Sequence, residues 1–174
     1  MPVLVGGALL LVAVVFVIFY LTGQNTGTKK VGAVQCNANE QLQTHYHAHL
    51  TIIQDGQERP IPANIGITES CLYWIHTHDS SGIVHIEAPA DQATHTFTLG
   101  DFFDVWQQPL DTTHVATFTL TSGQKLVAYV DGQAYTGEPR SIPLKSHSVI
   151  VLEIQPPAVE PPPSYTWDSN SYPK

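Results

Sequence analysis

The segment between Cys36 and Ile154 is divided into short alternating runs by turn residues, which leaves room for little helix. Alternation of apolar and polar residues indicates β-strands with one buried face, and Asp-Gly pairs favour two-residue hairpin turns. The run "HYHAHLTII" alternates in this way, and a "DG" turn follows it. The sequence predicts strands at 45–53, 57–63 (an edge strand, because of its prolines), 72–78, 83–88, 94–99, 115–120, 125–130 and 148–154.

One helix is expected in "TLGDFFDVWQQP", where Thr98 and Asp101 have capping-box spacing and Pro109 ends the run. The final run, "SVIVLEI", is apolar on both faces, as in a buried central strand. The pattern predicts an α+β domain with a mixed, mainly antiparallel sheet and one short helix, in a β-grasp-like arrangement. A β-sandwich that carries one helix is the alternative.

The chain begins with a stretch, 3–22, that contains no charge and is long enough to cross a bilayer as a helix. It has neither a basic start nor a clear cleavage site, so an uncleaved anchor is expected. At the other end, the prolines predict an extended tail, in which Tyr165 and Trp167 dock on the domain or a partner, or hang free. The expected organisation is a transmembrane anchor (1–22), a polar linker (23–35), a globular His-rich β domain (36–154) and a Pro-rich tail (155–174).

The compartment of the domain depends on two opposing signals. Lys29 and Lys30 follow the apolar stretch and favour a cytoplasmic domain. Cys36 and Cys71, the only cysteines, fit a disulfide in an oxidising compartment, although two free thiols in a cytosolic protein are the alternative. We expect a single-pass protein of the cell membrane with an extracytoplasmic domain, held by its N-terminal helix and able to meet a membrane-protein partner. The net charge of −8 and only seven Lys and Arg argue against nucleic-acid binding.

The stretch "HTHDSSGIVHIE" (76–87) predicts a hairpin with a histidine face. If "DSSG" is the loop, His76 lies opposite His85, and His78 shares their face because residues two apart on a strand point the same way. Their Cβ atoms would be roughly 5–7 Å apart, from which three imidazoles can converge on one ion. Glu87 continues this face, and Asp79 lies at its rim.

A second run, "HYHAH", places His45, His47 and His49 on one face of the strand at 45–53. Six of the nine histidines therefore lie in two short regions. If the strands at 45–53 and 72–78 are neighbours, the two sets can hold one ion or two. The predicted metal ligands are His76, His78, His85, His47 and His49, with Asp79, Glu87 and His45 around them.

Imidazole ligands suit Zn(II) and Cu(II), whereas Mg and Ca require sets of oxygens. Met1 is the only methionine, and bridged cysteines would offer no thiolate, so Cu(II) or Zn(II) is expected. The leading hypothesis is a metal-binding domain for buffering, delivery or support of a larger membrane complex. A zinc hydratase or hydrolase, with Glu87 or Asp79 as base, and a structural subunit whose histidines bind no metal are the alternatives.

The stretches "HYHAHLTI", "IPANIGI", "CLYWIHTHDSSGIVHIE", "FTLGDFFDVW" and "GEPRSIPLKSHSVIVLEI" resemble a family of uncharacterised bacterial and archaeal proteins that are exported or membrane-anchored. The resemblance covers roughly 36–167, and the His-Thr-His-Asp hairpin is its most specific part. It implies export and a single compact domain, but no activity.

Overall fold

The computed structural model describes residues 29–169 and 171–172. The predicted transmembrane anchor at 1–22 and the first part of the linker lie outside the described residues. Among the residues that are described, no helix is both long and apolar enough to span a membrane. Strand pairing begins at Lys30, which is earlier than the predicted domain start at Cys36.

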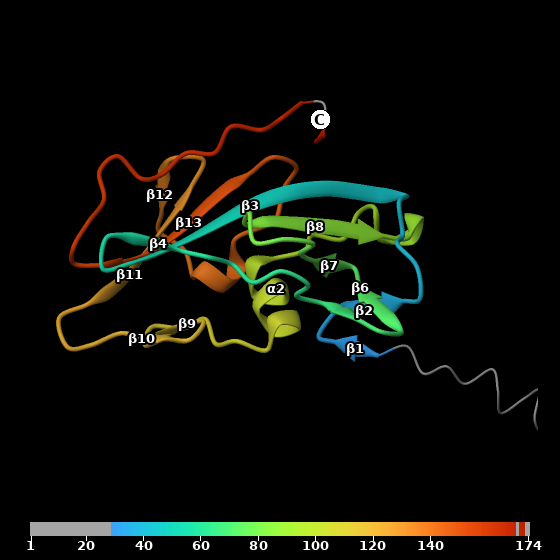
Figure 1. Cartoon of the computed structure of the whole chain (residues 1–174), viewed down its shortest axis with the longest axis horizontal. Coiled ribbons are helices and arrows are strands. Elements are labelled where there is room, and N and C mark those ends of the chain that lie inside the picture. The colour runs from blue at the N-terminus through green and yellow to red at the C-terminus, as the bar shows by residue number, and fades with distance from the viewer. Residues whose placement is uncertain (1–28, 170, 173–174) are drawn as a thin grey trace, which may run out of the picture.

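A mixed sheet of seven strands forms the centre of the domain (Figure 1). Its order is β12-β11-β13-β3-β8-β7, and β4 pairs with the end of β3. The pair β13 and β3 is parallel, and the other neighbours are antiparallel. The strands are β3 (Thr44–Gln54), β4 (Gln57–Arg59), β7 (Ile75–His76), β8 (Ile83–Ala88), β11 (Lys125–Val130), β12 (Gln133–Tyr135) and β13 (Val149–Gln155).

Helix α2 (Leu99–Trp106) covers one face of this sheet and forms the main core with it. Alternate residues of β3 and β13, such as Leu50 and Ile150, are fully buried in the same cluster as Phe102 and Phe103 of α2. The fold is therefore α+β, mostly β with one α-helix among the described residues, as the alternation predicted. The position of β13 between β11 and β3 confirms the predicted central strand.

The ends of α2 are set by the residues that predicted them. The Thr98 backbone N–H donates to Asp101 Oδ2 at 2.8 Å, and the Asp101 N–H donates to Thr98 Oγ1 at 3.3 Å. This is a complete capping box, which satisfies donors that the first turn leaves free. The helix ends at Gln107 in the left-handed conformation, two residues before Pro109.

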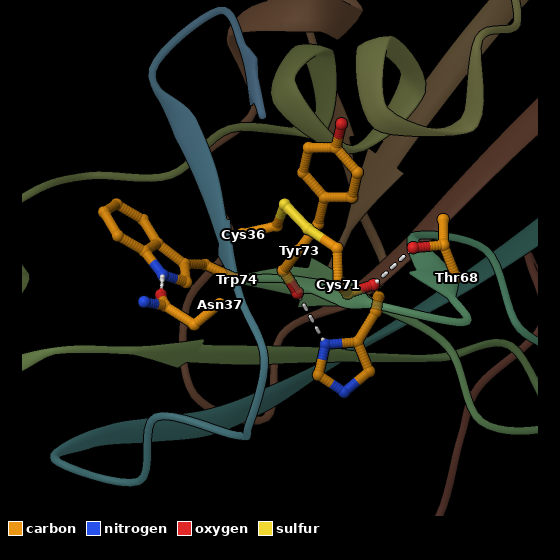
Figure 2. The surroundings of a disulfide bond; sticks show 7 residues. Cys36, Asn37, Thr68, Cys71, Tyr73 and Trp74 are labelled. Carbon is orange, nitrogen blue, oxygen red and sulfur yellow. Dashed lines mark hydrogen bonds between the residues drawn. A yellow bond between two sulfur atoms is a disulfide. The ribbon is translucent and has the colours of Figure 1, made fainter. Parts of the chain in front are cut away.

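A smaller four-stranded sheet packs beside the main one and contains the disulfide. Its strands are β1 (Lys30–Val31), β2 (Val34–Asn37), β5 (Ile67–Thr68) and β6 (Cys71–Tyr73). Cys36 and Cys71 join β2 to β6 with their Cα atoms 5.5 Å apart, which confirms the predicted pair (Figure 2). The Trp74 indole N–H donates to Asn37 Oδ1 at 2.7 Å and adds a second link between these segments (Figure 2).

The second face of the main sheet is covered by the C-terminal strap, which we define as residues 156–169 and 171–172. Figure 1 shows this segment passing along the side of β3 opposite α2. Val159 of the strap packs against Ile53, Tyr129 and Val151, and its N–H donates to the buried carboxylate of Glu153. The tail therefore docks on the domain, which is one of the three outcomes that the sequence left open.

Two predicted strand segments are wrong, and the predicted strand 72–78 is divided between β6 of the smaller sheet and β7 (Ile75–His76) of the main one. The segment 94–99 is not a strand, because Thr98 caps α2 and the residues before it form the connection from a 3-10 turn, η1 (Ala90–Gln92). The segment 115–120 is not one continuous strand. Instead, β9 (His114–Val115) turns at Ala116, which has a φ of 50°, and pairs with β10 (Phe118–Thr119).

We expect Thr98→Ala to lower the free energy of unfolding by about 1 kcal/mol, because the substitution removes the side-chain cap of α2. Urea unfolding followed by circular dichroism measures the change. The exposed Thr96 provides a matched control, and Thr96→Ala should change stability by less than about 0.5 kcal/mol. Equal effects of the two substitutions would show that the cap contributes nothing specific.

Candidate metal centre

Strand β8 lies between β3 and β7, and its register brings the two histidine runs together. His85 of β8 is paired with His47 of β3 on one side and with His76 of β7 on the other. His45 is paired in the same way with Glu87. The predicted pairing of His76 with His85 is thus present, but the two histidine strands are not direct neighbours. Both instead flank the strand that carries His85.

The first ligand group consists of His76, His78, His85 and Glu87, whose donor atoms lie within 4.8 Å of one another. The Nε2 atoms of His76 and His78 are 3.2 Å apart. Glu87 Oε1 lies 3.8 Å from His76 Nε2 and 3.4 Å from His85 Nδ1. Three imidazoles and one carboxylate therefore point into a volume of the size that one metal ion requires.

The second ligand group consists of His45, His47 and His85, again with donor atoms within 4.8 Å. The Nε2 atoms of His45 and His47 are 3.1 Å apart. His85 belongs to both groups, and its ring centre lies 4.6 Å from that of His47 and 4.5 Å from that of His78. The histidine face is therefore continuous across β3, β8 and the loop after β7.

Thr77 fixes the backbone between His76 and His78. Its hydroxyl donates to the Pro62 carbonyl at 2.9 Å and accepts from the Ile65 N–H at 3.1 Å, and its side chain is completely buried. Because neighbouring residues of an extended chain point to opposite sides, burial of Thr77 turns both flanking imidazoles outward. This accounts for the His-Thr-His pattern. Residues 62–65 lie outside the ligand groups, but their backbone holds Thr77 in place and so positions the two histidines.

A backbone hydrogen bond sets the tautomer of His76. Its Nδ1 lies 2.9 Å from the carbonyl oxygen of Tyr73, so Nδ1 carries the proton and donates it. The lone pair is then on Nε2, the atom that faces His78 and Glu87. Metal-ligating histidines are commonly oriented in this way by their other nitrogen. Tyr73 is in β6, the strand that the disulfide holds (Figure 2). The covalent link therefore supports the orientation of His76.

The protonation states also suit a metal. Burial lowers the pKa of His76 to about 4, although the Tyr73 carbonyl and Glu87 oppose this shift. Burial, and then the nearby His85 and His45, lower the pKa of His47 to about 4 as well. Burial alone would raise the pKa of Glu87, but contacts with His85, His76 and His45 outweigh it and the net shift is downward. At neutral pH these two imidazoles are neutral and the carboxylate is charged, as metal ligation requires.

Two buried polar atoms of the first group have no hydrogen-bond partner. They are Glu87 Oε2 and His85 Nδ1, which lies 3.4 Å from Glu87 Oε1 without forming a hydrogen bond. Buried polar atoms are nearly always satisfied, and leaving one unpaired costs about 1–3 kcal/mol. An ion bound between the imidazoles and the carboxylate would provide these atoms with a partner. The donor set and its unsatisfied atoms therefore fit a metal ion.

Two of the predicted residues lie outside both groups. His49 shares the face of His47, but its Nε2 is 3.0 Å from the Ser81 carbonyl oxygen and its ring stacks on Tyr165 at 3.8 Å. Asp79 accepts a hydrogen bond from the Ser81 N–H at 2.9 Å and stabilises the hairpin loop. In that loop Gly82 has a φ of 86°, and a Cβ there would overlap the Leu50 carbonyl, so the turn requires glycine.

The sequence interpretation missed three residues that border the site. Tyr172 of the strap places its ring 4.8 Å from that of His47 and 6.3 Å from that of His85. Glu40 Oε1 lies 3.9 Å from His78 Nε2 at the exposed rim. His147 lies beneath Trp167, with ring centres 4.5 Å apart and both ring nitrogens buried and unpartnered. The aromatic residues of the tail were the only available signal for this cover.

Neither protein-family models, nor curated proteins, nor solved structures include a match to this chain. The resemblance based on the His-Thr-His-Asp hairpin therefore stays an expectation. The candidate site depends on geometry and donor chemistry alone.

We expect the metal-free protein to lose stability as the pH falls from 7 to 4, in part through His76. Its pKa is about 4 in the folded chain and about 6.5 when unfolded, so the unfolded state binds more protons between these values. This contribution is complete above pH 6.5 and declines by an amount on the order of 3 kcal/mol by pH 4.

Urea unfolding at pH 7 and pH 4, in the presence of a chelator, measures that decline. His76→Gln should lose markedly less stability between the two values than the wild type does. The half-exposed His114 provides the control, because His114→Gln should behave as the wild type. A His76→Gln variant with an undiminished decline would contradict the assignment.

Proposed function

We propose that this protein binds Cu(II) or Zn(II) through His76, His78, His85 and Glu87. The observation that supports this most directly is the convergence of their donor atoms within 4.8 Å, with Glu87 Oε2 buried and without a hydrogen bond. Three imidazoles together with one carboxylate form a ligand set that suits these ions. Sulfur ligands are not available in the domain, since Cys36 and Cys71 are joined and Met1 is the only methionine.

The ligand count favours metal handling over hydrolysis or hydration. Catalytic zinc sites keep a coordination position open for water or substrate, whereas four protein ligands complete a tetrahedral ion. The ring of Tyr172 also lies against His47 and His85, on the side of the sheet that the strap covers. We therefore favour metal binding for buffering, delivery or support of a membrane complex, and no observation favours the zinc-enzyme alternative.

The strand order supports the β-grasp-like arrangement over the β-sandwich. Taken in chain order, β3 and β8 form an antiparallel pair, α2 follows, and β11 and β12 form a hairpin. The last strand, β13, returns parallel to β3 and lies between it and β11. The helix then packs on one face of the sheet, where a sandwich would place a second sheet.

We further propose that the apolar segment at 3–22 anchors the chain and that the domain lies outside the cytoplasm. The cysteine pair supports this location, because disulfides persist in oxidising compartments and are rare in the cytosol. The acidic net charge of −8 is compatible with attraction of cations to such a domain.

Metal content provides the direct test. The full chain, purified without a histidine tag, should contain near-stoichiometric copper or zinc by mass spectrometry. His76→Ala and His85→Ala should each reduce the content at least tenfold, because each removes a ligand of the first group. His114→Ala removes a histidine elsewhere and should leave the content unchanged. A wild-type chain that is empty and does not bind added Cu(II) or Zn(II) would refute the proposal.

Alkylation of thiols in intact cells tests the compartment. If the domain is extracytoplasmic, Cys36 and Cys71 should take up the alkylating reagent only after reduction. Cys36→Ser leaves Cys71 without its partner and should be labelled without reduction. Labelling of both cysteines in the unreduced wild type would place the domain in a reducing compartment.

A further inference from the structure

We propose that the histidine face holds two divalent metal ions in one dinuclear centre. The second ion is bound by His45 and His47, with the Glu87 carboxylate between the two ions and His85 as a ligand of one of them. This inference rests on the proposed function, since it extends the same site. It assigns a role to the second ligand group, which a single ion at the first group leaves unused.

The two His-x-His pairs have nearly the same geometry. Nε2 atoms are 3.1 Å apart in the pair His45 and His47 and 3.2 Å apart in the pair His76 and His78. Two nitrogens bound to one tetrahedral zinc at the usual bond length are about 3.3 Å apart. Each pair is therefore already spaced as two ligands of one ion.

The two pairs do not converge on one point in this structure. They come from β3 and from the end of β7, which lie on opposite sides of β8. Strands on either side of a middle strand are about 9.5 Å apart, because neighbours in a sheet are separated by 4.7–4.9 Å. In keeping with this, the first pair belongs to one compact ligand group and the second pair to another.

The middle strand supplies a carboxylate that both ions can share. Glu87 Oε1 lies 3.4 Å from His45 Nε2 of one pair and 3.8 Å from His76 Nε2 of the other. Its second oxygen, Oε2, is buried without a hydrogen-bond partner. A carboxylate with one oxygen between the two pairs and another unpaired is placed to bridge two ions. His85 is paired with a member of each set, His47 and His76.

Charge and exposure predict that the ions differ in affinity. The first group contains the carboxylate and the fully buried His76, which is 1% exposed. The second contains His45, whose side chain is 39% exposed, and no carboxylate of its own. Two dications against one carboxylate also repel each other, so the second ion should bind more weakly. Sequential binding is therefore expected, with the first group filled first.

The test is a titration of the chelator-stripped full chain with Zn(II), followed by calorimetry. The wild type should bind two equivalents in two steps. His45→Ala should remove the weaker step and keep the tighter one, and because His45 is partly exposed this substitution should leave the fold intact. His49→Ala is the matched control, since His49 lies on the same face of β3 but outside both groups, and it should retain two steps.

Cu(II) tests whether the ions share one centre. At two equivalents, the spin-integrated electron paramagnetic resonance signal should fall well below two spins per chain, because neighbouring Cu(II) ions couple. His45→Ala at one equivalent should give a full single spin.

The possible outcomes separate this inference from the proposed function. A wild type that binds one equivalent, unchanged in His45→Ala, would overturn the second ion and leave the proposed function intact. Two uncoupled spins would overturn the shared centre. A chain that binds no metal would overturn both.

Discussion

The register of β8 between β3 and β7 is the constraint on which core and candidate site both depend. Val84 and Ile86 point into the core, whereas His85 and Glu87 point to the opposite face. Because side chains alternate along a strand, a slip of one residue would bury the imidazole and carboxylate in the core and expose the apolar side chains. The burial that stabilises the sheet therefore also aligns the ligands. The pairing of His85 with histidines on both sides follows from apolar packing rather than from any attraction among the imidazoles.

The C-terminal strap covers the second face of the sheet and shields part of it from water. Val159 covers an apolar patch at one end, and Tyr165 and Tyr172 pack on histidine rings further along. This cover keeps His47 only 6% exposed, and burial is the largest cause of its lowered pKa. A sheet face open to water would present protonated, well-solvated histidines near pH 6. The strap instead keeps His47 buried and neutral, the state in which imidazole binds metal.

Local sequence patterns predicted the elements whose signals are themselves local. The capping box at Thr98 and Asp101, the apolar final strand and the pairing of His76 with His85 required only neighbouring residues. Errors arose where a nearby contact competed with the pattern. The alternation at 94–99 resembles a strand, but Thr98 is used as a helix cap. The segment 115–120 turns back on itself at Ala116 and is not one continuous strand.

The sequence by itself determined which residues can share a face, because the two-residue period of a strand is a property of the backbone. It therefore assigned His45, His47 and His49 to one set and His76 with His85 to another. Only the tertiary structure decided which strand lies between the sets, and it placed Glu87 within the first group and left His49 outside both. Strand adjacency depends on burial summed over the whole sheet and helix α2, and no local pattern encodes that sum. The docking of the strap was decided at the same level, by apolar patches formed from three different strands.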